Sequence, residues 1–149
     1  MTMIPSQLIE TGKAAREASR KLARVSSKVK NDVLLSIAEA LVGTAQKDVL
    51  AANEEDYCAS KATGLADAML DRLLLTPKRL EGMAADVQAV AALPDPVGEV
   101  FDGRTLSNGL VVEKKRVPIG VIGSIYESRP NVTVDISALC LKSGNACIL

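Results

Sequence analysis

The sequence predicts an α/β fold that begins with helices and ends with the first unit of a parallel sheet. Three observations predict it. Through the first ninety or so residues, apolar side chains recur at steps of three and four, the period of an amphipathic helix. Asn108-Gly109 lies between two extended runs, which is a strong hairpin signal. Residues 117–149 then read as strand, helix and strand, a unit that joins two parallel strands.

Three helices are expected before residue 65. The apolar stripe of the first consists of Ala15, Ala18, Leu22, Val25 and Val29. The stripe of the second consists of Val33, Leu34, Ile37, Ala38, Leu41 and Val42. Asn31 or Asp32 is the expected N-cap of this second helix. The third helix covers residues 47–62 and ends before Gly64.

A fourth helix and a hairpin follow. Thr76 caps this helix and Pro77 occupies its first position, where proline needs no hydrogen-bond acceptor. Its buried face runs toward Leu93 and consists of Leu80, Met83, Ala84, Val87, Val90 and Ala91. The hairpin strands are expected at residues 104–107 and 110–116. The dense charge at the end of the second strand is typical of a sheet edge.

The strand–helix–strand unit carries the polar turn that is most informative about function. An apolar, β-branched run at residues 117–126 leads into the turn, and residues 131–142 have helical spacing. Ser143-Gly144-Asn145 stops the helix, and a second apolar run begins at Ala146. Ligands of open parallel sheets bind at the carboxyl ends of strands, where this turn lies. A helix N-terminus there offers N–H donors, and Arg129 adds a planar donor suited to phosphate or carboxylate.

Composition excludes several classes of protein. The chain has 18 Lys+Arg and 18 Asp+Glu, so its neutral charge does not favour a nucleic acid or an anionic membrane surface as partner. It has no histidine, which excludes histidine-based catalysis and histidine metal sites. Its three scattered cysteines predict neither a zinc site nor disulfides and favour a reducing cytoplasm. No signal peptide and no run of about 20 apolar residues is present.

The turn also carries a family resemblance. GVIGSIYESRPNVTVDISALCLKSGNACIL resembles the corresponding stretch of the γ-glutamyl phosphate reductase (glutamate-5-semialdehyde dehydrogenase) family. This family belongs to the aldehyde dehydrogenase superfamily. The turn YESRPN, followed by VTVD and ALCLKSGNA, is specific to the family, whereas the wider superfamily has a shorter turn of the Pro-Trp-Asn type. The resemblance covers residues 14–149 and identifies the chain as the N-terminal portion of such a protein.

The resemblance implies an aldehyde dehydrogenase-like fold in three parts. Residues 1–103 are the helical part of the cofactor-binding domain, and residues 104–116 are strands of the oligomerisation region. Residues 117–149 are the first strand–helix–strand of a Rossmann-like NADP-binding domain. The catalytic domain is expected to lie outside this chain.

The activity implied by the resemblance is NADPH-dependent reduction of L-glutamyl 5-phosphate to L-glutamate 5-semialdehyde, with release of phosphate, in proline biosynthesis. A cysteine thiolate displaces phosphate, hydride reduces the thioester, and the thiohemiacetal collapses to the aldehyde. The resemblance also implies NADP as cofactor, no metal, a homo-oligomer when full length, a functional link to glutamate 5-kinase and a cytoplasmic location. Neither a nucleic acid nor a membrane is an expected partner.

Asn131 is the expected catalytic residue, because it matches the superfamily asparagine whose amide stabilises the oxyanion. The alternative is that Asn131 is only an N-cap, and both roles are compatible. The cofactor-binding positions matched by the turn are Tyr126, Glu127, Ser128, Arg129 and Pro130. Arg129 either holds a carboxylate or phosphate of the substrate or forms a structural salt bridge with Glu127 or Asp135.

None of Cys58, Cys140 and Cys147 matches the family's nucleophile, which lies in a segment farther downstream. We therefore expect this chain to be a fragment or a truncated protein that is inactive alone. Two alternatives remain at this point. One is another aldehyde dehydrogenase or acyl reductase of the superfamily, and the other is a non-catalytic truncated module.

Overall fold

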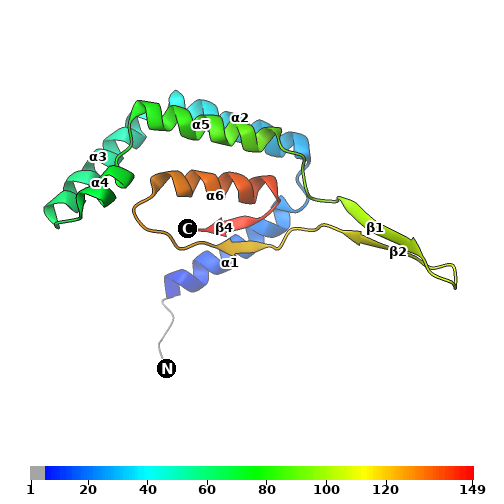
Figure 1. The fold of residues 1–149 in the computed structure, drawn as a ribbon. Helices are drawn as coiled ribbons and strands as arrows, with labels where there is room; N and C mark the ends of the chain where they lie inside the picture. The colour runs from blue at the N-terminus through cyan, green and yellow to red at the C-terminus, as the bar shows by residue number, and fades with distance from the viewer. Residues whose placement is uncertain (1–5) are drawn as a thin grey trace.

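A computed structural model describes residues 6–149 and shows helices lying over a two-stranded parallel sheet, with a β-hairpin projecting to one side (Figure 1). Residues 1–5 lie outside the described residues. They include the start of the predicted helical part and of the N-terminal segment that is not expected to be a signal peptide. The elements in chain order are α1 (Ser6–Leu22), α2 (Ser27–Val42), α3 (Gln46–Ala62), α4 (Asp67–Leu73), α5 (Pro77–Ala92), β1 (Val100–Thr105), β2 (Val111–Lys115), β3 (Val121–Gly123), α6 (Pro130–Lys142) and β4 (Ala146–Ile148).

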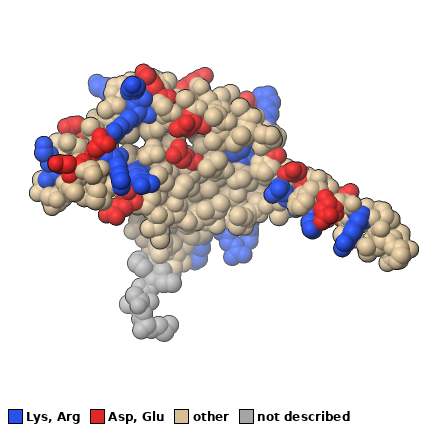
Figure 2. Space-filling view, viewed as in Figure 1, with Lys and Arg blue, Asp and Glu red and all other residues tan. Residues whose placement is uncertain are grey.

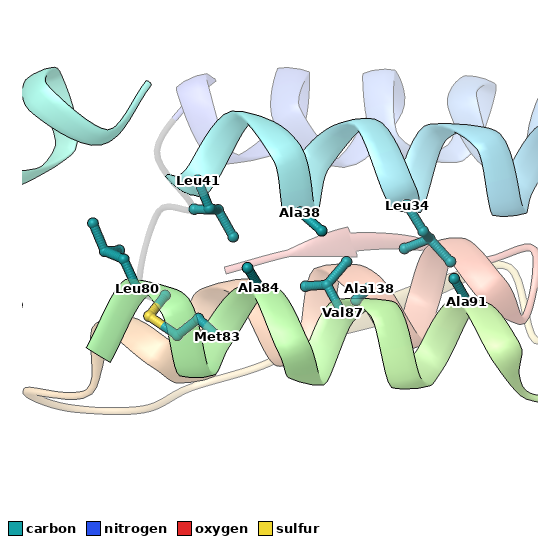
Figure 3. Packing of buried hydrophobic residues seen from close by; sticks show 9 residues of the cluster. All are labelled: Leu34, Ala38, Leu41, Leu80, Met83, Ala84, Val87, Ala91 and Ala138. Atoms are coloured by element: carbon teal, nitrogen blue, oxygen red, sulfur yellow. The ribbon is translucent and has the colours of Figure 1, made fainter. Parts of the chain in front are cut away.

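The hydrophobic core lies where α2 and α5 pack side by side over α6 (Figure 1). Its buried members are Leu34, Ala38, Leu41, Leu80, Met83, Ala84, Val87, Ala91 and Ala138 (Figure 3). Four of these are alanines, which let the helices approach closely. The predicted buried face of α5 is confirmed, with Val90 packed at its margin. The prediction for α2 is only half right, because Val33, Ile37 and Val42 face away from this core and are exposed.

The chain breaks between α1 and α2 at residues 23–26, whereas the apolar spacing predicted that the first helix continues through Val29. Ser26 is extended there, and its hydroxyl accepts a 3.4 Å hydrogen bond from the Val29 backbone N–H. This capping bond ends the regular spacing, since a serine side chain competes with helix continuation. The predicted caps Asn31 and Asp32 are therefore wrong, because both lie inside α2. In the predicted stripe Ala18 is exposed, and Ser19 is the buried residue of α1.

The third and fourth predicted helices are confirmed as α3 and α5, and the Thr76 hydroxyl caps α5 by accepting from the Arg79 N–H at 3.2 Å. The short helix α4 between them was not predicted. Buried Asn53 ties α3 to the segment after α4. Its Nδ2 donates to the Leu73 carbonyl at 2.8 Å, and its Oδ1 accepts from the Leu75 N–H at 2.7 Å.

The hairpin is confirmed as antiparallel β1 and β2, joined by a three-residue loop at residues 107–109. Gly109 has a φ of +84°, the left-handed conformation that such a loop requires at this position. The first strand begins at Val100 rather than at residue 104. The register shifts between Phe101 and Arg104, where Asp102 has a φ of +54°. This irregularity lets β1 pair with β2 on both sides of it.

The parallel strand–helix–strand unit is also confirmed. Val121 pairs with Ala146 and Gly123 with Ile148, and both α1 and α6 pack against the pair. β3 is shorter than the predicted run at residues 117–126, because β4 supplies partners for only three residues. The polar turn therefore starts at Ser124, directly after the carboxyl end of β3.

Candidate functional site

The turn ends in a helix N-terminus that no side chain caps. Arg129 is the N-cap residue of α6, with φ −139° and ψ 79°, and its side chain makes no capping hydrogen bond. Pro130 follows at the first helical position, where its missing N–H leaves no donor unsatisfied. Ser128 has a φ of +50°, a left-handed conformation that is uncommon outside glycine and reverses the chain here. The start of α6 therefore presents backbone donors and a partial positive charge toward the turn.

Asn131 is the second residue of α6, so the alternative that it is the N-cap is wrong. Its side chain is exposed, and Nδ2 lies 3.4 Å from Oδ2 of Asp135 one turn later. A side-chain amide carries two N–H donors. One is directed to Asp135 and the other remains for a ligand, which is what stabilisation of an oxyanion requires.

Two carboxylates lie beside Asn131. Asp135 of α6 and Asp86 of α5 line the same cavity of about 360 Å³. Burial raises the pKa of the Asp135 carboxyl, and the nearby charge of Asp86 raises it further, against a smaller lowering by the Asn131 hydrogen bond. Neither aspartate forms an ion pair with a cation of residues 6–149.

A neighbouring cavity of about 410 Å³ lies between the end of α4, the first half of α5 and the start of α6. Its volume falls in the range of small-molecule sites, about 300–1,000 Å³. Its polar lining includes Arg72, Arg79, Asp86, Arg129 and Asn131. In Figure 2, charged side chains of both signs gather over the end of the molecule that carries α3 and α4.

The three arginines of this cavity differ in what they bind. The Arg79 guanidinium closes the end of α4, because it donates to the carbonyls of Leu74 at 2.6 Å and of Asp71, and to Asp71 Oδ1 at 2.9 Å. Across residues 6–149, no carboxylate lies within ion-pair distance of Arg72 or Arg129. The alternative of a structural salt bridge from Arg129 to Glu127 or Asp135 is therefore wrong.

The other side of the turn faces the strand ends. Tyr126 lines a hollow of about 600 Å³ with Gly123, Ser124, Ile125, Ile148 and Leu149, at the carboxyl ends of β3 and β4. The Tyr126 hydroxyl lies 2.6 Å from Oγ1 of Thr133, which fixes the ring against α6. Glu127 and Ser128 line a third cavity of about 370 Å³, together with Tyr126 and both unpaired arginines. The six predicted residues thus surround the start of α6 but divide between two sides.

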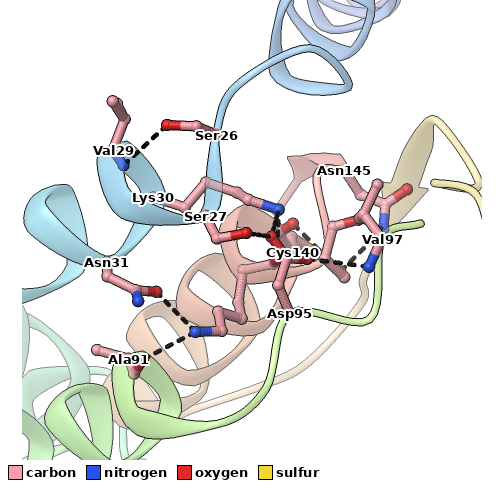
Figure 4. Close-up of polar contacts among 12 residues, drawn as sticks. Ser26, Ser27, Val29, Lys30, Asn31, Ala91, Asp95, Val97, Cys140 and Asn145 are labelled. Atoms are coloured by element: carbon pink, nitrogen blue, oxygen red, sulfur yellow. Dashed lines mark hydrogen bonds and ion pairs between the residues drawn. The ribbon is translucent and has the colours of Figure 1, made fainter. Parts of the chain in front are cut away.

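The opposite end of α6 is held by a buried ion pair (Figure 4). Lys30 is 1% exposed and pairs with Asp95, while its Nζ also donates to the Lys142 carbonyl at 3.1 Å. Ser27 Oγ donates to Asp95 Oδ2 at 2.6 Å, and the Val97 N–H donates to Oδ1 at 2.9 Å. Burial acts to raise the pKa of Asp95, but the hydrogen bonds and charge of Lys30, with the other two donors, hold it below its usual value.

Lys142 and Asn145 complete this end. The Lys142 Nζ donates to Asn31 Oδ1 at 2.6 Å and to the Ala91 carbonyl at 2.8 Å, so α6 is tied to α2 and α5. Asn145 Oδ1 accepts from the Gly120 N–H at 2.7 Å, which ties α6 to the start of β3. Between them Gly144 has a φ of +72°, and a Cβ there would lie 3.0 Å from Pro118 Cγ. These contacts fix the position of α6 and hence of the turn at its other end.

Neither Cys58 nor Cys140 has the surroundings of a nucleophile. A hydrogen bond with Glu54 raises the pKa of the exposed Cys58 thiol, and burial raises that of Cys140. Cys147 is half-buried in β4, with Sγ 3.9 Å from Ser137 Oγ. A nucleophilic thiolate needs a lowered pKa. Residues 6–149 contain no group of three His, Cys, Asp or Glu side chains that could hold a metal ion, and no helix among them is long and apolar enough to cross a membrane.

Arg72 and Asp86 line the cavity beside the turn, but the sequence did not indicate either of them as a site residue. Arg72 lies on α4, whose seven residues are too short for a clear apolar period, and Asp86 lies on the polar side of α5. A sequence signal existed for Asp86, since it precedes the core residue Val87 directly and so borders the buried face. No signal links either residue to the turn, because the contact spans some 45 to 60 positions of the chain.

No family model matches the sequence. Relatives called gamma-glutamyl phosphate reductase match nearly all of it. One from Roseiflexus castenholzii is 56% identical over 145 residues, which is 97% of this chain and 34% of the relative. Another from Dehalococcoides mccartyi is 57% identical over 143 residues, which is 96% of this chain and 34% of the relative.

Solved structures agree with this match. The crystal structure of gamma-glutamyl phosphate reductase from Thermotoga maritima superposes with a TM-score of 0.89 at 42% identity, covering 95% of this chain and 34% of that one. The corresponding Saccharomyces cerevisiae structure gives 0.85 at 39% identity, covering 99% and 37%. The predicted aldehyde dehydrogenase-like α/β fold is confirmed by this likeness. The chain spans about a third of the length of these relatives. Over almost its whole length the chain matches the N-terminal third of proteins of the gamma-glutamyl phosphate reductase family.

Proposed function

We propose that this chain supplies the oxyanion donor and part of the cofactor cleft of an NADPH-dependent reductase. The reaction is reduction of L-glutamyl 5-phosphate to L-glutamate 5-semialdehyde with release of phosphate, in proline biosynthesis. One observation carries the proposal beyond the family match. Asn131 presents a free amide N–H at the uncapped N-terminus of α6, next to the carboxyl ends of two parallel strands.

Asn131 acts by donating its free amide N–H to the oxygen of the substrate carbonyl as negative charge develops on it. The hydrogen bond to Asp135 orients the amide before the substrate arrives, so little reorganisation is needed during the reaction. The partial positive charge of the α6 N-terminus adds to this stabilisation. Pro130 keeps the helix start rigid, because its ring fixes φ.

NADPH supplies the hydride when it is bound. The hollow at the ends of β3 and β4 suits a flat cofactor ring, since Ile125, Ile148 and Leu149 give it apolar walls. The turn residues Tyr126, Glu127, Ser128, Arg129 and Pro130 form the rim between this hollow and the α4–α5 cavity. Placing the cofactor at strand ends follows the general rule for parallel sheets.

Further parts of the assignment follow from the family match. We place the protein in the cytoplasm, give it a functional link to glutamate 5-kinase, and assign residues 104–116 to an oligomer contact within homo-oligomers. The projecting hairpin supports the last point, because Leu106, Leu110 and Val111 on it are exposed apolar residues. The helical residues up to 103 and the unit at 117–149 belong to the cofactor-binding domain.

The nucleophilic thiol comes from outside residues 1–149, so these residues alone do not turn over substrate. The test joins residues 1–149 to the remaining two thirds of the Escherichia fergusonii relative, which is 56% identical over the matched stretch. We call this the joined protein. NADP⁺ reduction with L-glutamate 5-semialdehyde and phosphate is expected from the joined protein and not from the 149-residue chain. Turnover by the chain alone would contradict this part of the proposal.

In the joined protein, Asn131→Ala lowers kcat by about 10²–10³-fold, the usual cost of losing one oxyanion donor. Gln7→Ala is the matched control, because Gln7 is an exposed amide of α1 that lines none of the cavities around the turn. Its kcat stays within about twofold of the parent, as for a surface change. A folded Asn131→Ala variant with parental kcat would remove Asn131 from the mechanism.

A further inference from the structure

We propose that the cavity between α4, α5 and the start of α6 binds the amino-acid head of the substrate. Arg72 and Arg129 bind its α-carboxylate, and Asp86 binds its α-ammonium group. The proposal rests on the function proposed above and specifies which part of the site confers selectivity for a free amino acid. It also assigns Arg129 to the substrate rather than to the cofactor.

The two arginines carry the carboxylate assignment. Both line the 410 Å³ cavity and the adjoining 370 Å³ cavity, so both border the same space from different elements. Neither has a carboxylate partner among residues 6–149, whereas Arg79, which lines the same cavity, pairs with Asp71 and donates to the Leu74 carbonyl. A guanidinium group presents paired donors that match a carboxylate. Two such groups at one cavity predict an anionic ligand group there.

Asp86 carries the ammonium assignment. It lines the same cavity as the arginines, and no cation of residues 6–149 pairs with it. Burial is the main cause that raises the pKa of Asp135, and repulsion by the charge of Asp86 raises it further. A bound ammonium would offset this repulsion. Acid and base on one cavity wall complement the opposite charges of an α-amino acid.

The cavity is also placed correctly relative to the reacting atoms. Asn131 lines it at the α6 end, so a substrate whose head lies near Arg72 has its chain directed toward the oxyanion donor. The hollow at the strand ends shares neither Arg72 nor Asp86 nor Asn131. Substrate and cofactor therefore approach the turn from its two sides.

The kinetic test uses the joined protein. Arg72→Gln raises KM for L-glutamate 5-semialdehyde by about 10- to 100-fold, the cost of a lost hydrogen bond between charged groups, and leaves KM for NADP⁺ and phosphate unchanged. Arg72→Lys keeps the charge but not the paired geometry and gives an intermediate value. Lys78→Gln is the control, because Lys78 is an exposed cation in the first turn of α5 that does not line the cavity. A rise in KM for NADP⁺ or phosphate instead would assign the arginines to those ligands and overturn the proposal.

Shortened substrates separate the two ends of the head. With 5-oxopentanoate, which lacks the α-amino group, Asp86→Asn has no further effect while Arg72→Gln still raises KM. With 4-aminobutanal, which lacks the carboxylate, the pattern is reversed. Equal effects of both variants on all three aldehydes would contradict the assignment, because they would show a general loss of packing.

A binding measurement keeps this proposal separate from the function proposed above. Calorimetric titration of the joined protein with L-glutamate gives a Kd that Arg72→Gln and Asp86→Asn each raise by about 10-fold or more, and that the control Lys78→Gln leaves unchanged. A joined protein that binds L-glutamate in this way without reductase turnover refutes the function and upholds the subsite. Turnover with Arg72→Gln indistinguishable from the parent refutes the subsite and upholds the function.

Discussion

The two ends of α6 use polar residues in opposite ways. At its C-terminal end Lys142 and Asn145 are buried, and every polar group of their side chains has a partner within the fold. At its N-terminal end Arg129 and Asn131 are exposed, and within residues 6–149 no side chain caps the helix, one amide N–H of Asn131 has no acceptor, and the Arg129 guanidinium has no carboxylate partner. The satisfied end fixes the position of the helix, and the unsatisfied end can bind a ligand because the protein does not already occupy its donors.

The buried end also shows why such contacts are sensitive to change. Lys30 and Asp95 lose most of their hydration on folding, with side chains 1% and 11% exposed, and their attraction must offset that cost. On the same helix as Lys30, Lys28 and Asp32 are four positions apart and form a pair whose side chains are 83% and 55% exposed. Exposed pairs of this kind contribute little, about 0.3–0.5 kcal/mol on a helix.

The largest effect on stability is therefore expected at Lys30. Lys30→Met removes the ammonium and leaves Asp95 as an uncompensated buried charge, which costs about 3–5 kcal/mol of unfolding free energy. Urea unfolding of the 149-residue chain, followed by circular dichroism, measures the change. Lys28→Met is the matched control and changes the value by less than about 0.5 kcal/mol. Similar losses in both variants would contradict the distinction between buried and exposed pairs.

The pair of Lys30 and Asp95 also predicts that the free energy of unfolding depends on pH. Because the pKa of Asp95 is held below its value in the unfolded chain, about 3.9, its ionised form stabilises the fold above that pH. This contribution is lost as the pH falls through the folded pKa. In Lys30→Met the main opposing influence is gone, so burial raises the pKa of Asp95 and acid relieves the unpaired charge.

The gap in unfolding free energy between the parent chain and Lys30→Met should thus narrow as the pH falls from the raised pKa of Asp95 in the variant, above about 4, to its lowered pKa in the parent, below about 4. Unfolding curves of both proteins at a series of pH values measure it. Adding Asp95→Asn to Lys30→Met should recover part of the loss at neutral pH, because it removes the uncompensated charge. A gap that stays constant from neutral to acid pH would mean that Asp95 is not the group responsible.

The sequence predicted the parts of the fold that have a regular period or a local turn signal. The apolar face of α5, the Asn108-Gly109 hairpin and the parallel strand–helix–strand are of this kind, because each depends on neighbouring residues. The break at Ser26 was not predicted, because the apolar spacing in the sequence continues unchanged through Val29. The helix itself is interrupted there, and the Ser26 hydroxyl caps the next helix. Burial of Lys30 and Lys142 could not be predicted, because lysine is almost always exposed and their partners come from distant segments.

The candidate site divides in the same way. The six turn residues were predicted from a contiguous motif, and in the structure they lie together at the start of α6. Arg72 and Asp86 could not be found, because their relation to the turn exists only once α4 and α5 have packed over α6. Which side of the turn each residue faces likewise depends on packing. Sequence reasoning therefore supplied the residues of the motif but not the walls of the cavities around it.

The smallest effect on stability is expected where the effect on catalysis is largest. Asn131→Ala removes an exposed amide whose hydrogen bond within residues 6–149 is the 3.4 Å contact to Asp135, a pair four positions apart on a helix surface. Such pairs contribute about 0.2–0.5 kcal/mol, and alanine is the better helix former, so the two changes nearly cancel. Urea unfolding of the 149-residue chain should therefore agree between the parent and Asn131→Ala within about 0.5 kcal/mol. A loss comparable to that of Lys30→Met would show that Asn131 is part of the structural framework, and the contrast between the two ends of α6 would fail.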